Sequence, residues 1–363
     1  MIYFKTIQRH LKKNKIHPPL LFIHGAWHSS WCWEENFVPY FQKAGYDVYT
    51  MDLRGHGKSP NQNGKFRWNS IRNYVQDVEE VIKKLPQFPI LIGHSMGGLI
   101  VQKILEKNHV SKAVLLASVP PHGVFRITLE LLIRHPIRFL KVLLTLSLFP
   151  IVEDTKLGSE LFFSESLDKQ KAIQFASKTQ DESFLAFLDM LIFSLPKSDQ
   201  IQTPLLVLGG EKDRFFVPWE VKRTANTYQS EMDIFQGMGH NLMLDEGWEK
   251  VAERIHTYLN GSKIDLEKKK NETFVSKKKN STKQKSVKLK NKSKKQKTNP
   301  KRFSFLSIFN PNRNNSASRP KTRSVEHPEN FSECLSQDRQ CFVEFQKQEV
   351  LLRTIYNISN LIV

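Results

Sequence analysis

The chain has 363 residues, which is enough for one substantial hydrophobic core, and length alone permits two domains. Its net charge of +19 is unevenly placed: residues 262–363 hold 24 Lys and Arg against 9 Asp and Glu, whereas the first 261 residues hold 31 against 27. The three cysteines form no CxxC pair, and an odd, sparse count fits a reduced compartment better than a disulfide framework.

The sequence shows no secretion signal and no segment that would cross a membrane. Residues 1–15 are basic but lack the apolar stretch of a secretion signal. No run reaches the roughly 18 apolar residues that a membrane-spanning helix needs, and the longest approach, 139–149, is interrupted by Lys141. We therefore expect a cytoplasmic protein, with peripheral attachment to membranes as an alternative that depends on the basic segment.

Between residues 19 and 261, short apolar runs alternate with segments of helical periodicity. The runs predict buried strands at 20–25, 47–53, 90–95, 112–119, 204–210 and 232–237. Apolar residues at helical spacing predict helices at 71–85, 98–108, 219–228 and 247–259. The strands are apolar throughout rather than alternating, which is typical of a sheet covered on both faces. The pattern therefore predicts an α/β fold with an open, mostly parallel sheet.

The alternation breaks between residues 120 and 202, where the sequence is helical throughout and includes the apolar stretches 125–149 and 184–193. We expect this insertion to form a helical cap over the carboxyl ends of the strands, where ligands bind in such sheets. The predicted domains are therefore a core of residues 1–119 and 203–261, the cap of residues 120–202, and a carboxyl-terminal extension of residues 262–363.

The cap is unusually rich in Leu and Phe, with basic residues interspersed at Arg126, Arg134, Arg138 and Lys141. Two interpretations fit equally well. The apolar residues are either an ordinary core or the floor of a site for acyl chains, with a basic rim for anionic head groups.

The extension of residues 262–363 is a low-complexity, Lys-, Ser- and Asn-rich segment with too little apolar surface to offset the entropy of ordering it, so we expect it to be largely disordered. One alternative is a polybasic element attracted to anionic lipid. In that case the apolar side chains of residues 303–309 would insert beside it. A nucleic-acid partner is disfavoured, because the segment contains no recognisable nucleic-acid-binding domain.

The sharpest chemical signal is GHSMGG at residues 93–98, directly after an apolar strand and directly before a helical segment. In this context it predicts a nucleophile elbow formed by Gly93, His94, Ser95 and Gly97. The glycines are needed because the turn is sharp, and the turn holds the Ser95 hydroxyl at the edge of the sheet.

A serine needs a base to accept its proton, and the base needs an orienting acid. His240 lies after the last short strand and before the final helix, and Asp213 follows the strand at 204–210. The order Ser95, Asp213, His240 is the one this kind of sheet uses. Glu211 and Asp245 are rival acids, less suitably placed at a strand end and near a helix start.

Acyl transfer also needs donors for the oxyanion. We expect these to be the backbone amides of Met96, directly after the nucleophile, and of Ala26, in the loop after the first strand of the core. Gly25 would let that loop approach Ser95.

Several segments together resemble the α/β-hydrolase superfamily over roughly residues 18–260, and most closely its lysophospholipase-like and esterase-like members with a helical cap. The segments are HGAW at 24–27, DLRGHGKS at 52–59, GHSMGG at 93–98, GGEKD at 209–213 and GMGHNLML at 237–244. The resemblance implies an eight-stranded sheet, a Ser/acid/His triad and no cofactor. The hairpin that usually precedes the first core strand is shortened, because residues 3–15 offer one strand at most.

The remaining histidines near these segments are interpreted as structural, and no metal site is expected. They are His24, His28, His56, His94 and His122.

The favoured hypothesis is a serine hydrolase that cleaves carboxylic esters with apolar acyl groups through an acyl-enzyme at Ser95. Thioester or carbon–carbon bond hydrolysis uses the same triad and stays open, as does a catalytically silent hydrolase-fold binding protein. An epoxide hydrolase or dehalogenase is disfavoured, because such members carry Asp where Ser95 stands. The sequence leaves the oligomeric state open.

Overall fold

One central sheet organises the computed structural model, which describes residues 2–7, 17–61 and 64–261. Its seven strands follow the order β1-β3-β2-β4-β5-β6-β7, with β1 antiparallel to β3 and every other pair parallel. The strands are β1 (Phe4–Ile7), β2 (Leu20–Ile23), β3 (Val48–Met51), β4 (Ile90–His94), β5 (Ala113–Leu116), β6 (Leu205–Gly210) and β7 (Glu231–Phe235). The α/β-hydrolase architecture is confirmed, although the described residues form seven strands where the resemblance implied eight.

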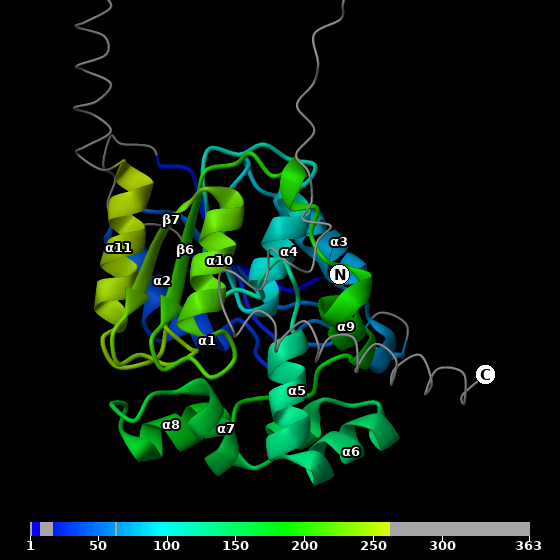
Figure 1. Ribbon diagram of the computed structural model, residues 1–363. Helices are drawn as coiled ribbons and strands as arrows, with labels where there is room; N and C mark the ends of the chain where they lie inside the picture. Colours follow the sequence, from blue (N-terminus) through cyan, green and yellow to red (C-terminus); the bar gives the residue numbers. More distant parts are fainter. Residues whose placement is uncertain (1, 8–16, 62–63, 262–363) are drawn as a thin grey trace, which may run out of the picture. The chain divides into compact units, whose positions relative to one another are not determined.

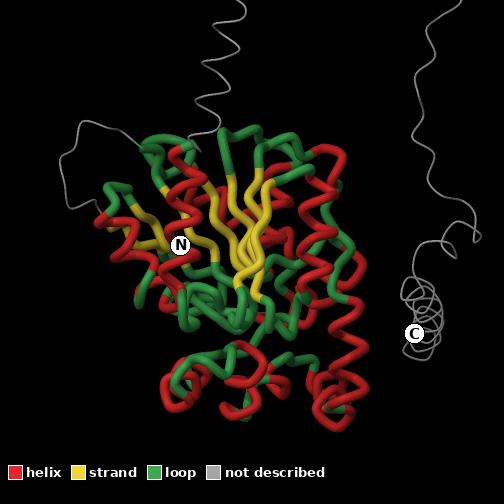
Figure 2. Tube along the Cα trace, turned by 60° about the vertical axis from the view of Figure 1, so that its left-hand side comes forward, coloured by secondary structure: helices red, strands yellow, loops and turns green. Residues whose placement is uncertain are grey.

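Helices cover both faces of this sheet, as the wholly apolar strands require (Figure 2). On one side lie α2 (Phe37–Lys43) and α11 (Trp248–Asn260), and on the other α3 (Ile71–Ile82), α4 (Met96–Leu105) and α10 (Pro218–Tyr228) (Figure 1). The short helices α1 (Trp31–Glu34) and η1 (Phe66–Trp68) lie in the loops after β2 and β3.

We call the segment between β5 and β6, residues 120–202, the helical insert. Its helices are α5 (Phe125–Arg134), α6 (Pro136–Thr145), η2 (Phe149–Ile151), α7 (Thr155–Phe162), α8 (Lys169–Ala176), α9 (Phe184–Leu188), the π-helix η3 (Asp189–Phe193) and η4 (Ser198–Gln200). Of these helices, α5 to α8 lie beyond the end of the sheet, whereas α9 lies beside α3 (Figure 1).

The stretch 125–149 is not one helical run. His135 has non-helical angles (φ −133°, ψ 55°) and Pro136 starts a new helix, because the proline ring clashes with the preceding turn and its nitrogen has no proton to donate. Leu146, in the left-handed conformation at φ 51°, then ends α6. The insert therefore consists of short helices joined by sharp turns.

A polar strap, residues 180–183, ties the insert to the core. Glu182 accepts a hydrogen bond from the Tyr74 hydroxyl (2.7 Å) and pairs with His56 Nε2 (3.1 Å), and its side chain is fully buried. The amide of Gln180 donates to the Trp27 carbonyl (2.9 Å), and its side chain bonds to the amide of Gly57 (2.8 Å). The strap thus links the insert to two separate loops at the end of the sheet.

No helix in the described ranges has the length and apolarity needed to cross a membrane. The basic extension, with its proposed lipid contacts at residues 303–309, lies outside the described residues.

Candidate active site

Ser95 stands on a strained turn between β4 and α4. Its backbone angles are φ 52° and ψ −118°, in a region that costs a residue with a side chain about 1–2 kcal/mol. A Cβ on Gly93 would collide with the carbonyl oxygen of Gly97, and a Cβ on Gly97 would collide with that of Ile23. The close backbone approach at these two positions makes the sharp turn possible, as the sequence pattern required.

Asp213 and His240 lie in direct contact behind this turn. Asp213 Oδ2 is 2.9 Å from His240 Nδ1, and its Oδ1 accepts the amides of Phe215 (2.7 Å) and Phe216 (2.9 Å). Both residues are buried, with 3% and 2% of their surfaces exposed. The two amide bonds fix the carboxylate, so that it can hold one imidazole orientation and leave Nε2 directed elsewhere.

The imidazole of His240 lies beside the turn that carries Ser95. Its ring centroid is 4.7 Å from that of His94, the residue preceding Ser95, and the His94 Nε2 is 3.2 Å from the His240 carbonyl oxygen. The ring of Phe215 is 4.6 Å from that of His240 and also lines the cavity that contains Ser95. The structure thus brings Ser95, His240 and Asp213 from three distant segments into one neighbourhood.

The two rival carboxylates have other partners. Glu211 accepts the amide of Gly237 (3.0 Å) at the turn after β7. Asp245 is fully buried and accepts the amide of Gly239 (2.6 Å) together with the amide and hydroxyl of Ser164 in the insert (3.0 and 2.9 Å). Asp245 therefore anchors the loop that carries His240. Sequence reasoning missed this role, because nothing in the sequence links Asp245 to a serine 81 residues away.

The loop after β2 carries the expected oxyanion donor Ala26. A Cβ on Gly25 would lie 2.8 Å from the Ser95 Cβ, so the loop approaches the serine closely. His24 Nδ1 donates to the Gly25 carbonyl (2.9 Å), and His24 Nε2 accepts the amide of Leu53 (3.0 Å). Because a trans peptide directs its two polar groups oppositely, this bond turns the N–H of Ala26 away from His24. In the part of the chain that the structure describes, neither the Ala26 nor the Met96 amide has an acceptor.

Three buried histidines around the site are held neutral. Burial, reinforced by the neighbouring His56, lowers the pKa of His24 to about 4, and burial lowers that of His28 to about 3. Burial and the nearby His240 place the pKa of His94 well below its usual value. A neutral ring carries one donor and one acceptor, so each of these side chains holds a fixed hydrogen-bonding role. The pair His28–Asn241 (3.0 Å) is one such contact that the sequence did not indicate.

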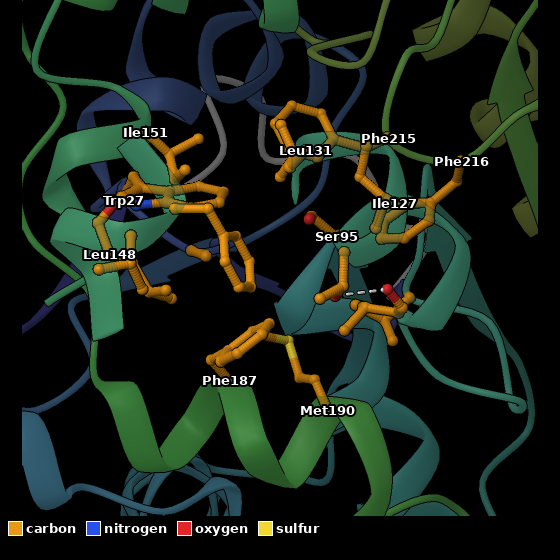
Figure 3. A pocket seen from close by; sticks show the side chains of 16 residues that line it. Trp27, Ser95, Ile127, Leu131, Leu148, Ile151, Phe187, Met190, Phe215 and Phe216 are labelled. Carbon is orange, nitrogen blue, oxygen red and sulfur yellow. Dashed lines mark hydrogen bonds between the residues drawn. The ribbon is translucent and has the colours of Figure 1, made fainter. Parts of the chain in front are cut away.

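Ser95 opens into a partly open apolar cavity whose empty space, including the open solvent at its mouth, is about 590 Å³ (Figure 3). Of its 16 lining residues, only Ser95, Thr128 and Trp27 carry a polar side-chain group. The Thr128 hydroxyl is bonded to the Val124 carbonyl (2.8 Å), and the Trp27 indole N–H donates to the Leu148 carbonyl (3.3 Å). The Ser95 hydroxyl has no hydrogen-bond partner among the described residues. It is therefore the free polar group in an apolar chamber. The core and the insert both contribute walls, among them Phe215 and Phe216 from the core and Ile127, Val142, Phe187 and Met190 from the insert.

Within the described ranges, no three His, Cys, Asp or Glu side chains lie together in a way that could hold a metal ion. Of the other histidines singled out in the sequence, His56 bonds to the Arg54 carbonyl as well as to Glu182. His122 Nε2 has no hydrogen bond among the described residues and lies 3.7 Å from Glu220.

Comparison with known proteins places this geometry in a family. The Alpha/beta hydrolase family matches residues 20–254. Among curated proteins, the chain is 34% identical over 108 residues to a bifunctional esterase/perhydrolase of Acinetobacter calcoaceticus, covering 28% of this chain and 38% of that protein. It is 31% identical over 146 residues to a probable lysophospholipase L2 of Haemophilus influenzae, covering 37% and 43%. These matches span less than half the length of the relatives.

Solved structures agree on the fold. A putative non-heme bromoperoxidase of Mycobacterium tuberculosis superposes with a TM-score of 0.57 at 20% identity, covering 72% of this chain and 96% of that one. A monoacylglycerol lipase of Paleococcus ferrophilus gives a TM-score of 0.53 at 21% identity, covering 71% and 98%. With the sheet order, the serine on its strained turn and the family match over most of the described residues, the chain belongs to the α/β-hydrolase family.

Proposed function

We propose that this protein hydrolyses carboxylic esters with apolar acyl groups, through an acyl-enzyme formed at Ser95. The observation that carries the proposal is the free Ser95 hydroxyl inside a cavity whose other walls are almost entirely apolar. Such a chamber favours an acyl chain over a polar group, because each buried methylene contributes about 0.8 kcal/mol. That contribution corresponds to a roughly fourfold gain in kcat/KM per methylene until the chamber is full.

The reaction assigns one role to each group. His240 takes the proton of Ser95 as Oγ attacks the ester carbonyl, and Asp213 stabilises the imidazolium without accepting its proton. The amides of Ala26 and Met96, which lack protein acceptors, donate to the carbonyl oxygen as it becomes an oxyanion. The alcohol leaves with the proton from His240, and His240 then activates a water that hydrolyses the acyl-enzyme.

The relatives support this class of reaction. The names of two curated relatives include esterase and lysophospholipase activities, and one solved neighbour is an esterase from Exiguobacterium antarcticum (TM-score 0.54, 21% identity). Because the matched segments cover only part of those relatives, we carry over the reaction type alone.

The nucleophile is tested by labelling with a fluorophosphonate probe. Wild type should be labelled, and Ser95→Ala should not. A matched control is Ser118→Ala, which removes a buried hydroxyl just after the neighbouring strand β5 that donates to the Val119 carbonyl and accepts from the Gln102 side-chain amide. This variant should still be labelled. Equal labelling of Ser95→Ala and wild type would reject Ser95 as the nucleophile.

The substrate class is tested with p-nitrophenyl esters of increasing chain length. We expect kcat/KM to rise with each methylene and then to fall when the chain exceeds the chamber. A maximum at the acetate would contradict an acyl role for the cavity. Faster turnover of a matched thioester would show that the preferred leaving group is a thiol and that the substrate class is a thioester. Recovery of unchanged ligand without turnover of any ester would favour the binding-protein alternative.

A further inference from the structure

The helical insert carries most of the exposed large apolar side chains, and several of them lie on α6. Of the eleven such side chains that are exposed among the described residues, eight belong to the insert. Ile137, Leu140 and Leu144 of α6 are 73%, 55% and 76% exposed. Their spacing of three and four residues places them on one side of the helix. We call this face, together with the neighbouring Ile133 (69% exposed), the outer apolar face.

The same helix also forms a wall of the cavity. Phe139 and Val142, on other sides of α6, line the chamber that contains Ser95. A single helix therefore separates the apolar chamber from the outer apolar face. An acyl chain leaving a lipid phase at that face would have only the thickness of one helix to pass before reaching the chamber.

The outer apolar face is bordered by positive charge. Residues 131–152 include Arg134, Arg138 and Lys141 but no acidic residue. Arg134 and Lys141 have side chains 70% and 55% exposed, and their ion-pair partners come from the flanking residues Glu130 and Glu153. Arg138 pairs with Asp154 (3.0 Å) as well as with Glu153, so the exposed cations at this border are Arg134 and Lys141. An apolar helix face with basic residues at its border is typical of helices that lie in the head-group region of a membrane.

We propose that the outer apolar face docks on a phospholipid surface that contains anionic lipid. A second copy of this chain fits the geometry less well. A ten-residue helix is about 15 Å long and about 10 Å wide, so its projected area is roughly 150 Å². A stable protein interface needs on the order of 800 Å² from each partner. A lipid surface accepts a narrow protruding helix without a matching partner surface.

The docking itself does not depend on the chemistry at Ser95, whereas the delivery of acyl chains from that surface rests on the proposed function. In a docked state, the side chains of Leu140 and Leu144 leave water. Half-burial of two leucines corresponds to roughly 2 kcal/mol, or about a 30-fold change in the vesicle partition constant.

The test uses the full-length chain in flotation with phosphatidylcholine vesicles that contain phosphatidylserine. The salt concentration is about 1 M, where the screening length is about 3 Å and the charge of residues 262–363 contributes little. Wild type should float, and Leu140→Gln/Leu144→Gln should bind at least tenfold more weakly. The matched control is Phe88→Gln, which removes an exposed aromatic side chain (40% exposed) before β4 and outside the insert. It should bind within about twofold of wild type. Equal binding by the double variant and wild type would overturn the proposal.

Two further experiments test the role of the basic border and whether the outer apolar face binds lipid or a second copy of the chain. At low salt, Arg134→Gln/Lys141→Gln should weaken binding to anionic vesicles more than to neutral ones, and equal loss on both would contradict the basic border. Sedimentation of wild type and Leu140→Gln/Leu144→Gln without lipid tests the competing occupant. A dimer that this double substitution dissociates would replace the lipid surface with a second copy.

Failure of docking and failure of the proposed function give different results. Because Leu140 and Leu144 do not line the cavity, the double variant should hydrolyse a short water-soluble ester at the wild-type rate. Hydrolysis of long-chain esters presented in vesicles should fall with binding. Ser95→Ala should bind vesicles as wild type does. If no ester is hydrolysed but the double variant still loses binding, docking stands and the proposed function fails.

Discussion

The buried pair His56–Glu182 joins the insert to the core, and its removal should destabilise the protein in a pH-dependent way. Both side chains are fully buried. Burial acts to lower the pKa of His56, but the charge and hydrogen bond of Glu182 outweigh it and raise that pKa. Burial acts to raise the pKa of Glu182. The charge and hydrogen bond of His56, together with hydrogen bonds from the Ser183 amide and the Tyr74 hydroxyl, outweigh burial and lower that pKa.

Glu182→Gln keeps an oxygen for the Tyr74 hydroxyl but removes the charge opposite His56. The loss of one charge-assisted hydrogen bond in a buried site costs about 1.5–3 kcal/mol. For a domain of this size, about 2 kcal/mol corresponds to a decrease in Tm of roughly 4–8 °C. We expect a decrease of that order near pH 5.5.

The pH dependence of stability follows from the raised pKa of His56 and the lowered pKa of Glu182. The raised pKa of His56 gives stability that is fully present below its unfolded value near 6.5 and is lost as the pH rises through the folded pKa. The lowered pKa of Glu182 gives stability that is present above its unfolded value near 4.3 and is lost as the pH falls through the folded pKa. The contribution of the pair is therefore greatest between about pH 4.5 and 6.5. The difference in Tm between wild type and Glu182→Gln should then be smaller at pH 8.5 than at pH 5.5.

The assay is thermal unfolding by circular dichroism at both pH values for wild type, Glu182→Gln, His56→Gln and the double variant. Residues in direct contact should show a coupling free energy on the order of 1–2 kcal/mol at pH 5.5. Additive effects of the two substitutions, or a Tm difference that is the same at both pH values, would refute the reasoning.

Three further predictions concern the candidate site. Asp213→Asn should lower kcat for ester hydrolysis by about 10⁴-fold, because the wrong imidazole tautomer is then favoured, whereas Glu211→Gln should stay close to wild type; similar losses in both would move the acid away from Asp213. Gly25→Ala should reduce kcat at least about 100-fold, because its Cβ would lie 2.8 Å from that of Ser95 and displace the oxyanion loop. The control is Gly158→Ala in α7, where the nearest atom to the added Cβ would be 3.5 Å away, so this variant should keep its activity and gain up to about 1 kcal/mol of stability. An equal loss of kcat in Gly25→Ala and Gly158→Ala would mean that the loss does not come from the oxyanion loop. Because burial lowers the pKa of His28 to about 3, the unfolded chain binds more protons than the folded chain below about pH 6.5, and this group should cost roughly 2 kcal/mol of stability between pH 7 and pH 5. Urea unfolding should show a smaller loss over that interval for His28→Gln, and an unchanged loss would place the acid sensitivity elsewhere.

The sequence predicted those parts of the fold that depend on local pattern. The apolar strands and the glycines around Ser95 are short-range signals, because a parallel sheet and a sharp turn each demand particular residues at adjacent positions. The order of Ser95, Asp213 and His240 along the chain was also sufficient to select residues that the structure brings into one neighbourhood.

Long-range polar contacts could not be predicted in the same way. The pair His56–Glu182 spans 126 residues and the contact of Asp245 with Ser164 spans 81, and neither leaves a periodic trace in the sequence. Pro136 is a known helix breaker, but the apolar residues on both sides of it favoured one continuous helical stretch, so the break was not predicted. Helical periodicity also did not distinguish the side of α6 that lines the cavity from the side that is exposed, because both are apolar.

The strained backbone of Ser95 has a consequence for protein engineering. Glycine adopts a positive φ without the steric cost that a serine side chain incurs, so Ser95→Gly should relieve the turn and raise the melting temperature. With Ser95 as the nucleophile, directed evolution that selects for heat tolerance alone would favour substitutions at this position that abolish catalysis. Every round of such a selection would therefore need a turnover screen beside it.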